Sequence, residues 1–181
     1  MNTTHFSWLA TLIIPLYICY AKVSTLPDDR LSSQTELLGA ATRKPVMGIL
    51  EASVIEALTR GSKFGVLTTG VAWVAPLTKA ILELSIVSKE AFAGVVATGL
   101  GVLDFHTSSG ELGKDDAVEN NVRIGAQTLV AKGCNVIVLG CAGMEGMEDA
   151  VKAGIYTSKE VRVVDGVRAG VEIIAKKLHD S

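Results

Sequence analysis

The segment 136–144, Val-Ile-Val-Leu-Gly-Cys-Ala-Gly-Met, contains the side chain best suited to chemistry, the thiol of Cys141. A buried strand is predicted to end just before Gly140, and a helix is predicted from Met144, so Cys141 lies in the turn between them. Unpaired amides and the positive dipole end at a helix N-terminus favour a thiolate. Gly140 and Gly143 permit close approach of backbone and substrate. The same amides can hold a developing oxyanion or enolate.

A single cysteine is more often a small buried hydrophobic residue than a reactive group. For Cys141, the flanking glycines and the strand-to-helix position favour the reactive interpretation. Cys134 precedes the same strand and is expected at its opposite end. We therefore assign Cys134 to packing.

From residue 45 onward, predicted strands alternate with predicted helices. The strands are expected at residues 64–68, 92–97, 135–139 and 161–164. The helices are expected at 51–60, 73–86, 115–132 and 144–153, followed by a closing helix that Asp165 caps. Such alternation predicts an α/β fold with a parallel sheet and flanking helices. Ligands of these sheets bind beyond the carboxyl ends of the strands.

The residues to search for a site are therefore those that follow the predicted strands. They are Thr68 and Thr69, the glycine-rich loop 98–101 and the segment 140–144. Glu51 opens the first predicted helix and is also near the expected site, although a glutamate there is as often only a favourable charge at a helix N-terminus.

Composition excludes several classes of function. The net charge is −2, and the 17 basic residues form no stripe or aromatic-rich patch, so nucleic acid is not an expected partner. Three cysteines are too few for a disulfide framework. The histidines lie far apart at positions 5, 106 and 179, and no metal site is predicted.

The N-terminal 25 residues differ from the rest of the chain. Residues 8–20 are almost entirely apolar, but about 13 residues are too few to span a bilayer as a helix. The run has the length of a signal-peptide core with a cleavage site after Ala21, although no basic residue precedes it. A buried strand, or a segment foreign to the fold, are the alternatives. We divide the chain into this segment (1–25), a linker with about one helical turn (26–43) and an α/β domain (44–181).

Four segments resemble, in the same order, the hydantoin and allantoin racemase branch of the Asp/Glu/hydantoin racemase superfamily. They are Lys-Pro-Val-Met-Gly-Ile-Leu-Glu-Ala-Ser at 44–53, Phe-Gly-Val-Leu-Thr-Thr at 64–69, Val-Leu-Gly-Cys-Ala-Gly-Met at 138–144 and Val-Val-Asp-Gly-Val at 163–167. The resemblance covers about residues 44–178.

The resemblance implies racemisation of a hydantoin-like or amino-acid-derived small molecule without a cofactor, in which two cysteines exchange protons with opposite faces of the substrate. Cys141 would be one of the two. The implied substrate-binding residues are Thr68, Thr69, Gly140, Ala142, Gly143 and Glu51. The resemblance also implies a cytoplasmic homo-oligomer, whereas a signal peptide over residues 1–21 would imply secretion.

The chain departs from the family pattern before residue 44. The family's Asn-Pro-Asn turn is absent, and Cys19 is the one candidate for the first catalytic cysteine. The resemblance thus implies one complete half plus a fragment of a two-domain fold. Two alternatives to a racemase remain open, a single-cysteine decarboxylase or isomerase of the same superfamily and a catalytically inactive fragment.

Overall fold

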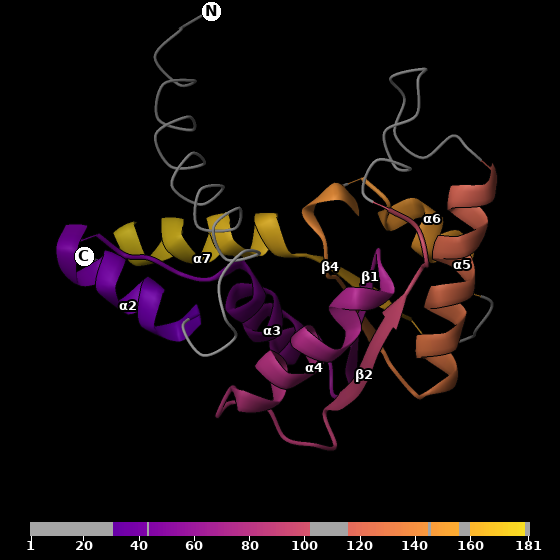
Figure 1. Cartoon of the computed structure of the whole chain (residues 1–181), viewed down its shortest axis with the longest axis horizontal. Helices are drawn as coiled ribbons and strands as arrows, with labels where there is room; N and C mark the ends of the chain where they lie inside the picture. The colour runs from indigo at the N-terminus through magenta and orange to yellow at the C-terminus, as the bar shows by residue number, and fades with distance from the viewer. Residues whose placement is uncertain (1–30, 43, 102–115, 145, 156–159, 180–181) are drawn as a thin grey trace, which may run out of the picture. The chain divides into compact units, whose positions relative to one another are not determined.

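The computed structural model describes residues 31–42, 44–101, 116–144, 146–155 and 160–179. The chain divides into two compact units, Met1–Ile49 with Gly170–Ser181, and Leu50–Ala169. The first contains helix α2 (Leu31–Thr42) and most of α7 (Gly166–His179), and the second contains the sheet (Figure 1). The apolar run at 8–20, Cys19 and His106 lie outside the described residues.

The sheet has four parallel strands in the order β2-β1-β3-β4. Their bounds are β1 Phe64–Thr68, β2 Phe92–Ala97, β3 Val136–Leu139 and β4 Arg162–Asp165. Each of the four predicted strands is present within about one residue of its expected bounds. The predicted α/β class with a parallel sheet is confirmed.

The two central strands are apolar because both of their faces are covered. Every residue of β1 and β3 is buried, as expected for parallel strands between layers of helices. Their register pairs Phe64 with Val136 and Leu67 with Leu139, so the two strands end level with each other.

Helices cover the sheet on both sides, with α5 and α6 on one side and α3 and α4 on the other (Figure 1). The helical bounds are α3 Ile49–Arg60, η1 Val71–Trp73, α4 Val74–Glu83, α5 Asp116–Ala131, η3 Ala142–Met144 and α6 Glu148–Ala153. α5 packs against β1 and β2 at very short range, since a Cβ at Gly125 would lie 2.4 Å from Leu67 Cδ1. None of the helices in the described part of the chain is long and apolar enough to cross a membrane.

Three helices differ from their predicted extent. The segment expected to be a linker with one helical turn forms the 12-residue α2, in which leucine, glutamate and alanine supply enough helix propensity. The helix expected at 73–86 ends at Glu83, because Leu84 adopts an extended conformation that turns the chain toward β2. The helix expected from Met144 begins at Glu148.

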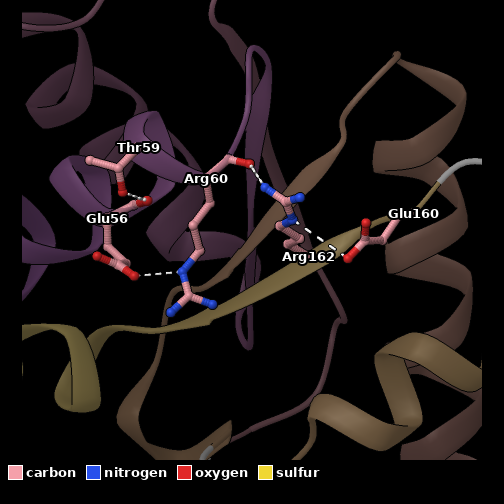
Figure 2. Close-up of polar contacts among 5 residues, drawn as sticks. All are labelled: Glu56, Thr59, Arg60, Glu160 and Arg162. Atoms are coloured by element: carbon pink, nitrogen blue, oxygen red, sulfur yellow. Dashed lines mark hydrogen bonds and ion pairs between the residues drawn. The ribbon is translucent and has the colours of Figure 1, made fainter.

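The amino edge of the sheet is held by side chains. Asn135 Oδ1 accepts a hydrogen bond from the Lys63 amide at 3.0 Å, and the Asn135 carbonyl accepts one from the Arg162 amide at 3.0 Å. Figure 2 shows Arg162 between the backbone carbonyl of Arg60, to which it donates, and the carboxylate of Glu160. These bonds connect the end of α3 with β1, β3 and β4.

We predict that Asn135→Ala lowers the free energy of unfolding by about 1–2 kcal/mol, because the part-buried Lys63 amide loses its acceptor. Urea unfolding measures the change. Thr59→Ala is the control, since the Thr59 hydroxyl donates to the Glu56 carbonyl at an exposed position, and its effect should stay below about 0.5 kcal/mol. Equal effects of both substitutions would contradict the role given to Asn135.

Candidate functional site

Backbone hydrogen bonds connect three strand ends at the carboxyl edge of the sheet. The Gly140 amide donates to the Leu67 carbonyl at 2.7 Å, which ties the end of β3 to β1. The Thr98 amide donates to the Thr68 carbonyl at 2.8 Å, which ties the end of β2 to β1. The residues that follow β1, β2 and β3 are therefore brought to one edge, as the topology predicted.

Thr98 adds a connection that sequence reasoning did not identify. Its hydroxyl donates to the Thr69 carbonyl at 3.2 Å, and the neighbouring Gly99 amide donates to the same carbonyl at 3.0 Å. The loop 98–101 was expected at the site. The one signal in the sequence for Thr98 itself is that a threonine directly follows a predicted strand. The two bonds fix the backbone of Thr69.

Thr68 and Thr69 are buried, each with 1% of its surface exposed. Thr68 lies beside Gly140, since a Cβ on that glycine would stand 3.5 Å from Thr68 Cβ and only 2.5 Å from Val66 Cγ1. The absence of a side chain at Gly140 thus allows β3 to end close against β1. The structure brings Thr68 and Gly140 together, and the predicted substrate contacts of the threonines stay a prediction.

Cys141 directly follows this close contact. Its side chain is half-buried and packs against a core cluster that includes Met144 and Leu139. Its carbonyl accepts a hydrogen bond from the Met144 amide at 3.0 Å, which closes the short turn η3.

The prediction that Cys141 lies directly before an α-helix is wrong. α6 has six residues and starts seven positions after Cys141, with Met147 as its N-cap. The α-helix dipole therefore does not act on this thiol. The first amides of η3, at Ala142 and Gly143, are the remaining local donors, because the first amides of a helical turn have no acceptor within it.

Glu51 lies in the first turn of α3 and is half-buried. A carboxylate in this position interacts favourably with the positive end of the helix dipole. This placement agrees with the interpretation of Glu51 as a favourable charge at a helix N-terminus. Contact of Glu51 with a substrate stays a prediction. Among the described residues, no three histidine, cysteine or acidic side chains are grouped so that they could hold a metal ion.

Cys134 differs from Cys141 in its burial. It is buried in the core, and its Sγ atom would lie 2.9 Å from a Cβ at Gly65. Burial raises the pKa of the Cys134 thiol to about 11, and the charges of Lys63 and Lys132 lower it by less than burial raises it. Its assignment to packing agrees with this environment.

The raised pKa of Cys134 predicts a loss of stability at high pH. Below pH 9.0, its ordinary value, the thiol is protonated in both states and its contribution is complete. Between that value and about 11, the unfolded chain releases the proton and the folded chain keeps it, so the free energy of unfolding falls by up to about 1.4 kcal/mol per pH unit. Cys134→Ala removes this contribution. In urea unfolding, the difference in the free energy of unfolding between wild type and Cys134→Ala should shrink as pH rises above 9.0. Parallel pH profiles of the two proteins would refute the raised pKa of Cys134.

Gly140→Ala should lower the free energy of unfolding by about 1–3 kcal/mol, because the new methyl group would overlap Val66 and crowd the Leu67 carbonyl. Gly70→Ala is the control, at a glycine that follows the neighbouring strand β1, since its Cβ would have only Trp73 in ordinary contact at 3.9 Å. Chemical unfolding of both variants tests the claim. An equally small effect at both positions would show that β3 can move away from β1.

Comparisons with known proteins identify the family of this chain. A model of the Asp/Glu/hydantoin racemase family matches residues 35–174. An uncharacterized protein of Schizosaccharomyces pombe is 35% identical over 133 residues, which are 74% of this chain and 53% of that protein. The hydantoin racemase of Pseudomonas sp. (strain NS671) is 33% identical over 134 residues, which are 72% of this chain and 48% of that enzyme.

Two solved structures have a similar fold. The allantoin racemase of Pseudomonas fluorescens matches with a TM-score of 0.61 and 27% identity over 75% of this chain and 53% of that structure. The allantoin racemase of Klebsiella pneumoniae matches with a TM-score of 0.59 and 26% identity over 75% of this chain and 51% of that structure. The chain spans about half the length of the relatives it matches. Together with the α/β fold, these matches show that the chain belongs to the Asp/Glu/hydantoin racemase family.

Proposed function

We propose that this protein is a cofactor-independent racemase of hydantoin-like small molecules in which Cys141 transfers the proton. The observation that carries the proposal is the position of Cys141, a half-buried thiol directly after a buried parallel strand, at the edge where this fold class binds ligands. Membership of a family that includes a hydantoin racemase supports the substrate class.

The proposed step is a proton transfer from carbon to sulfur. The Cys141 thiolate removes the hydrogen at C5 of the hydantoin ring, and the electrons of the C–H bond move onto the neighbouring carbonyl oxygen to give an enolate. The amides of Ala142 and Gly143 would stabilise that oxygen. Return of a proton to the opposite face of C5 gives the other enantiomer, and return to the same face regenerates the substrate.

Inversion requires a second acid on the opposite face of the substrate. Of the two cysteines in the described part of the chain, Cys141 lies at the carboxyl edge and Cys134 lies in the core. This arrangement favours a second candidate function, one-sided proton transfer as in a single-cysteine decarboxylase or isomerase. Cys19 remains the candidate for the second thiol of a racemase.

We assign the other predicted residues to the walls of the site. Gly140 keeps β3 against β1 and so positions Cys141. Thr68, the last residue of β1, and Thr69, which follows it, would form the buried floor beneath the substrate, and Glu51 is the candidate for a polar contact from α3. A thiol base requires a compartment in which thiols stay reduced, which favours the cytosol.

Hydrogen exchange at C5 tests the proposal. A single enantiomer of a 5-substituted hydantoin is incubated in deuterated water with the protein, and deuterium uptake is followed by mass spectrometry. Wild type should incorporate deuterium, and Cys141→Ala should lower the rate at least about 100-fold, because a general base is removed. Cys134→Ala is the control that also removes a thiol, and it should retain the wild-type rate where circular dichroism shows it folded.

Chiral chromatography of the same samples separates the two candidate functions. Deuterium uptake with loss of optical purity supports two-sided transfer, and uptake with retained configuration supports one-sided transfer. Exchange by Cys141→Ala at the wild-type rate would refute the role of this cysteine in either case.

A further inference from the structure

The turn after β2 holds the end of β1 beyond the point at which strand pairing stops. The pairing of β1 with β2 ends at Thr68, and its pairing with β3 ends at Leu67. Thr69 therefore lies past the last pair on both sides. Its carbonyl is nevertheless held, because the Thr98 hydroxyl donates to it at 3.2 Å and the Gly99 amide donates to it at 3.0 Å. Both donors come from the β2 side of the sheet.

The backbone conformation of Gly99 accompanies this contact. Its φ is +80°, in the left-handed region that favours glycine, and a Cβ there would have no atom within 4 Å. Conformation and not space thus requires a glycine after Thr98. A carbonyl oxygen has two lone pairs, and at Thr69 the two donors occupy both of them. The peptide group that follows Thr69 is therefore fixed in orientation by the loop 98–101.

The Thr98 hydroxyl also connects Thr69 with the rest of this loop. It accepts a hydrogen bond from the Leu100 amide at 3.4 Å while it donates to the Thr69 carbonyl. Leu100 packs against the same core cluster as Cys141. One hydroxyl thus joins the end of β1 to a residue that shares its packing with the thiol of the proposed reaction.

We propose that Thr98 is a positioning residue of the racemase site, and that its hydroxyl holds Thr69 in the orientation that binds the substrate. The inference rests on the proposed function, in which Thr68 and Thr69 form the floor of the site. Thr98 acts through the Thr69 carbonyl and does not need to touch the substrate. A binding group that is ordered before the substrate arrives loses less freedom on binding, so the bond increases affinity.

The position of Cys141 depends on other bonds. The Gly140 amide holds the end of β3 by donating to the Leu67 carbonyl at 2.7 Å. The Met144 amide closes the turn after Cys141 at 3.0 Å. Loss of the Thr98 hydroxyl should therefore weaken substrate binding and leave the proton transfer largely intact, whereas a general loss of structure would impair both.

Thr98→Val removes the hydroxyl and keeps the branched shape of the side chain. Deuterium uptake at C5 of 5-benzylhydantoin, measured over a range of substrate concentrations, gives kcat and KM. We expect Thr98→Val to raise KM at least about fivefold and to change kcat by less than about twofold. Thr98→Ser keeps the hydroxyl and should keep KM within about twofold of the wild-type value.

Thr78→Val is the matched control. The Thr78 hydroxyl is also part-buried and donates to a backbone carbonyl, that of Val74 at 2.7 Å, but it does so within α4. Its removal should leave kcat and KM unchanged. Gly99→Ala tests the same Thr69 carbonyl should Thr98→Val fail to fold, because a β-carbon disfavours the φ of +80° and draws the amide away. KM should rise in this variant as well.

Three results would overturn the role of Thr98 while the proposed function stands. They are a wild-type KM in Thr98→Val, a KM in Thr98→Ser as high as in Thr98→Val, and a fall in kcat as large as the rise in KM. A wild type that takes up no deuterium, or uptake that Cys141→Ala retains, would instead refute the proposed function and with it this role of Thr98.

Discussion

Close packing around β1 is the constraint on which the rest of the sheet depends. β1 is hydrogen-bonded to β2 on one side and β3 on the other, and all five of its residues are buried. Three glycines make this possible, because a Cβ at Gly65, Gly125 or Gly140 would lie within about 2.5 Å of a neighbouring side chain. The helices and strands around β1 therefore have little freedom to shift, and the residues that follow the strands share this rigidity.

Backbone hydrogen bonds connect the strands at both edges of the sheet. At the amino edge, side chains add to them, since Asn135 and Arg162 join α3, β1, β3 and β4. At the carboxyl edge, backbone amides of Gly140, Thr98 and Gly99 make most of the connections between strands. Cys141 directly follows this edge, and a backbone held in place is the support that the proposed proton transfer at carbon requires.

The two described cysteines show how position decides chemistry. Cys134 and Cys141 are separated by one strand, yet Cys134 is buried among apolar side chains with a raised pKa, and Cys141 is half-buried beside a glycine turn. The proposed function rests on the position of Cys141 directly after β3, at the carboxyl edge of the sheet.

The sequence by itself determined the strands, most helices and the edge at which the strand-end residues meet. Continuous apolar runs, which are typical of buried parallel strands, and their alternation with amphipathic segments carry that information locally. Asp165 was correctly predicted to cap the last helix, where its carboxylate accepts a hydrogen bond from the Arg168 amide at 2.8 Å. The late start of α6 after Cys141 is a local departure from the predicted helix. Only the tertiary structure decided the order β2-β1-β3-β4 and the bond from the Thr98 hydroxyl to the Thr69 carbonyl. Both depend on contacts between residues distant in the chain, for which a single sequence contains no periodic signal.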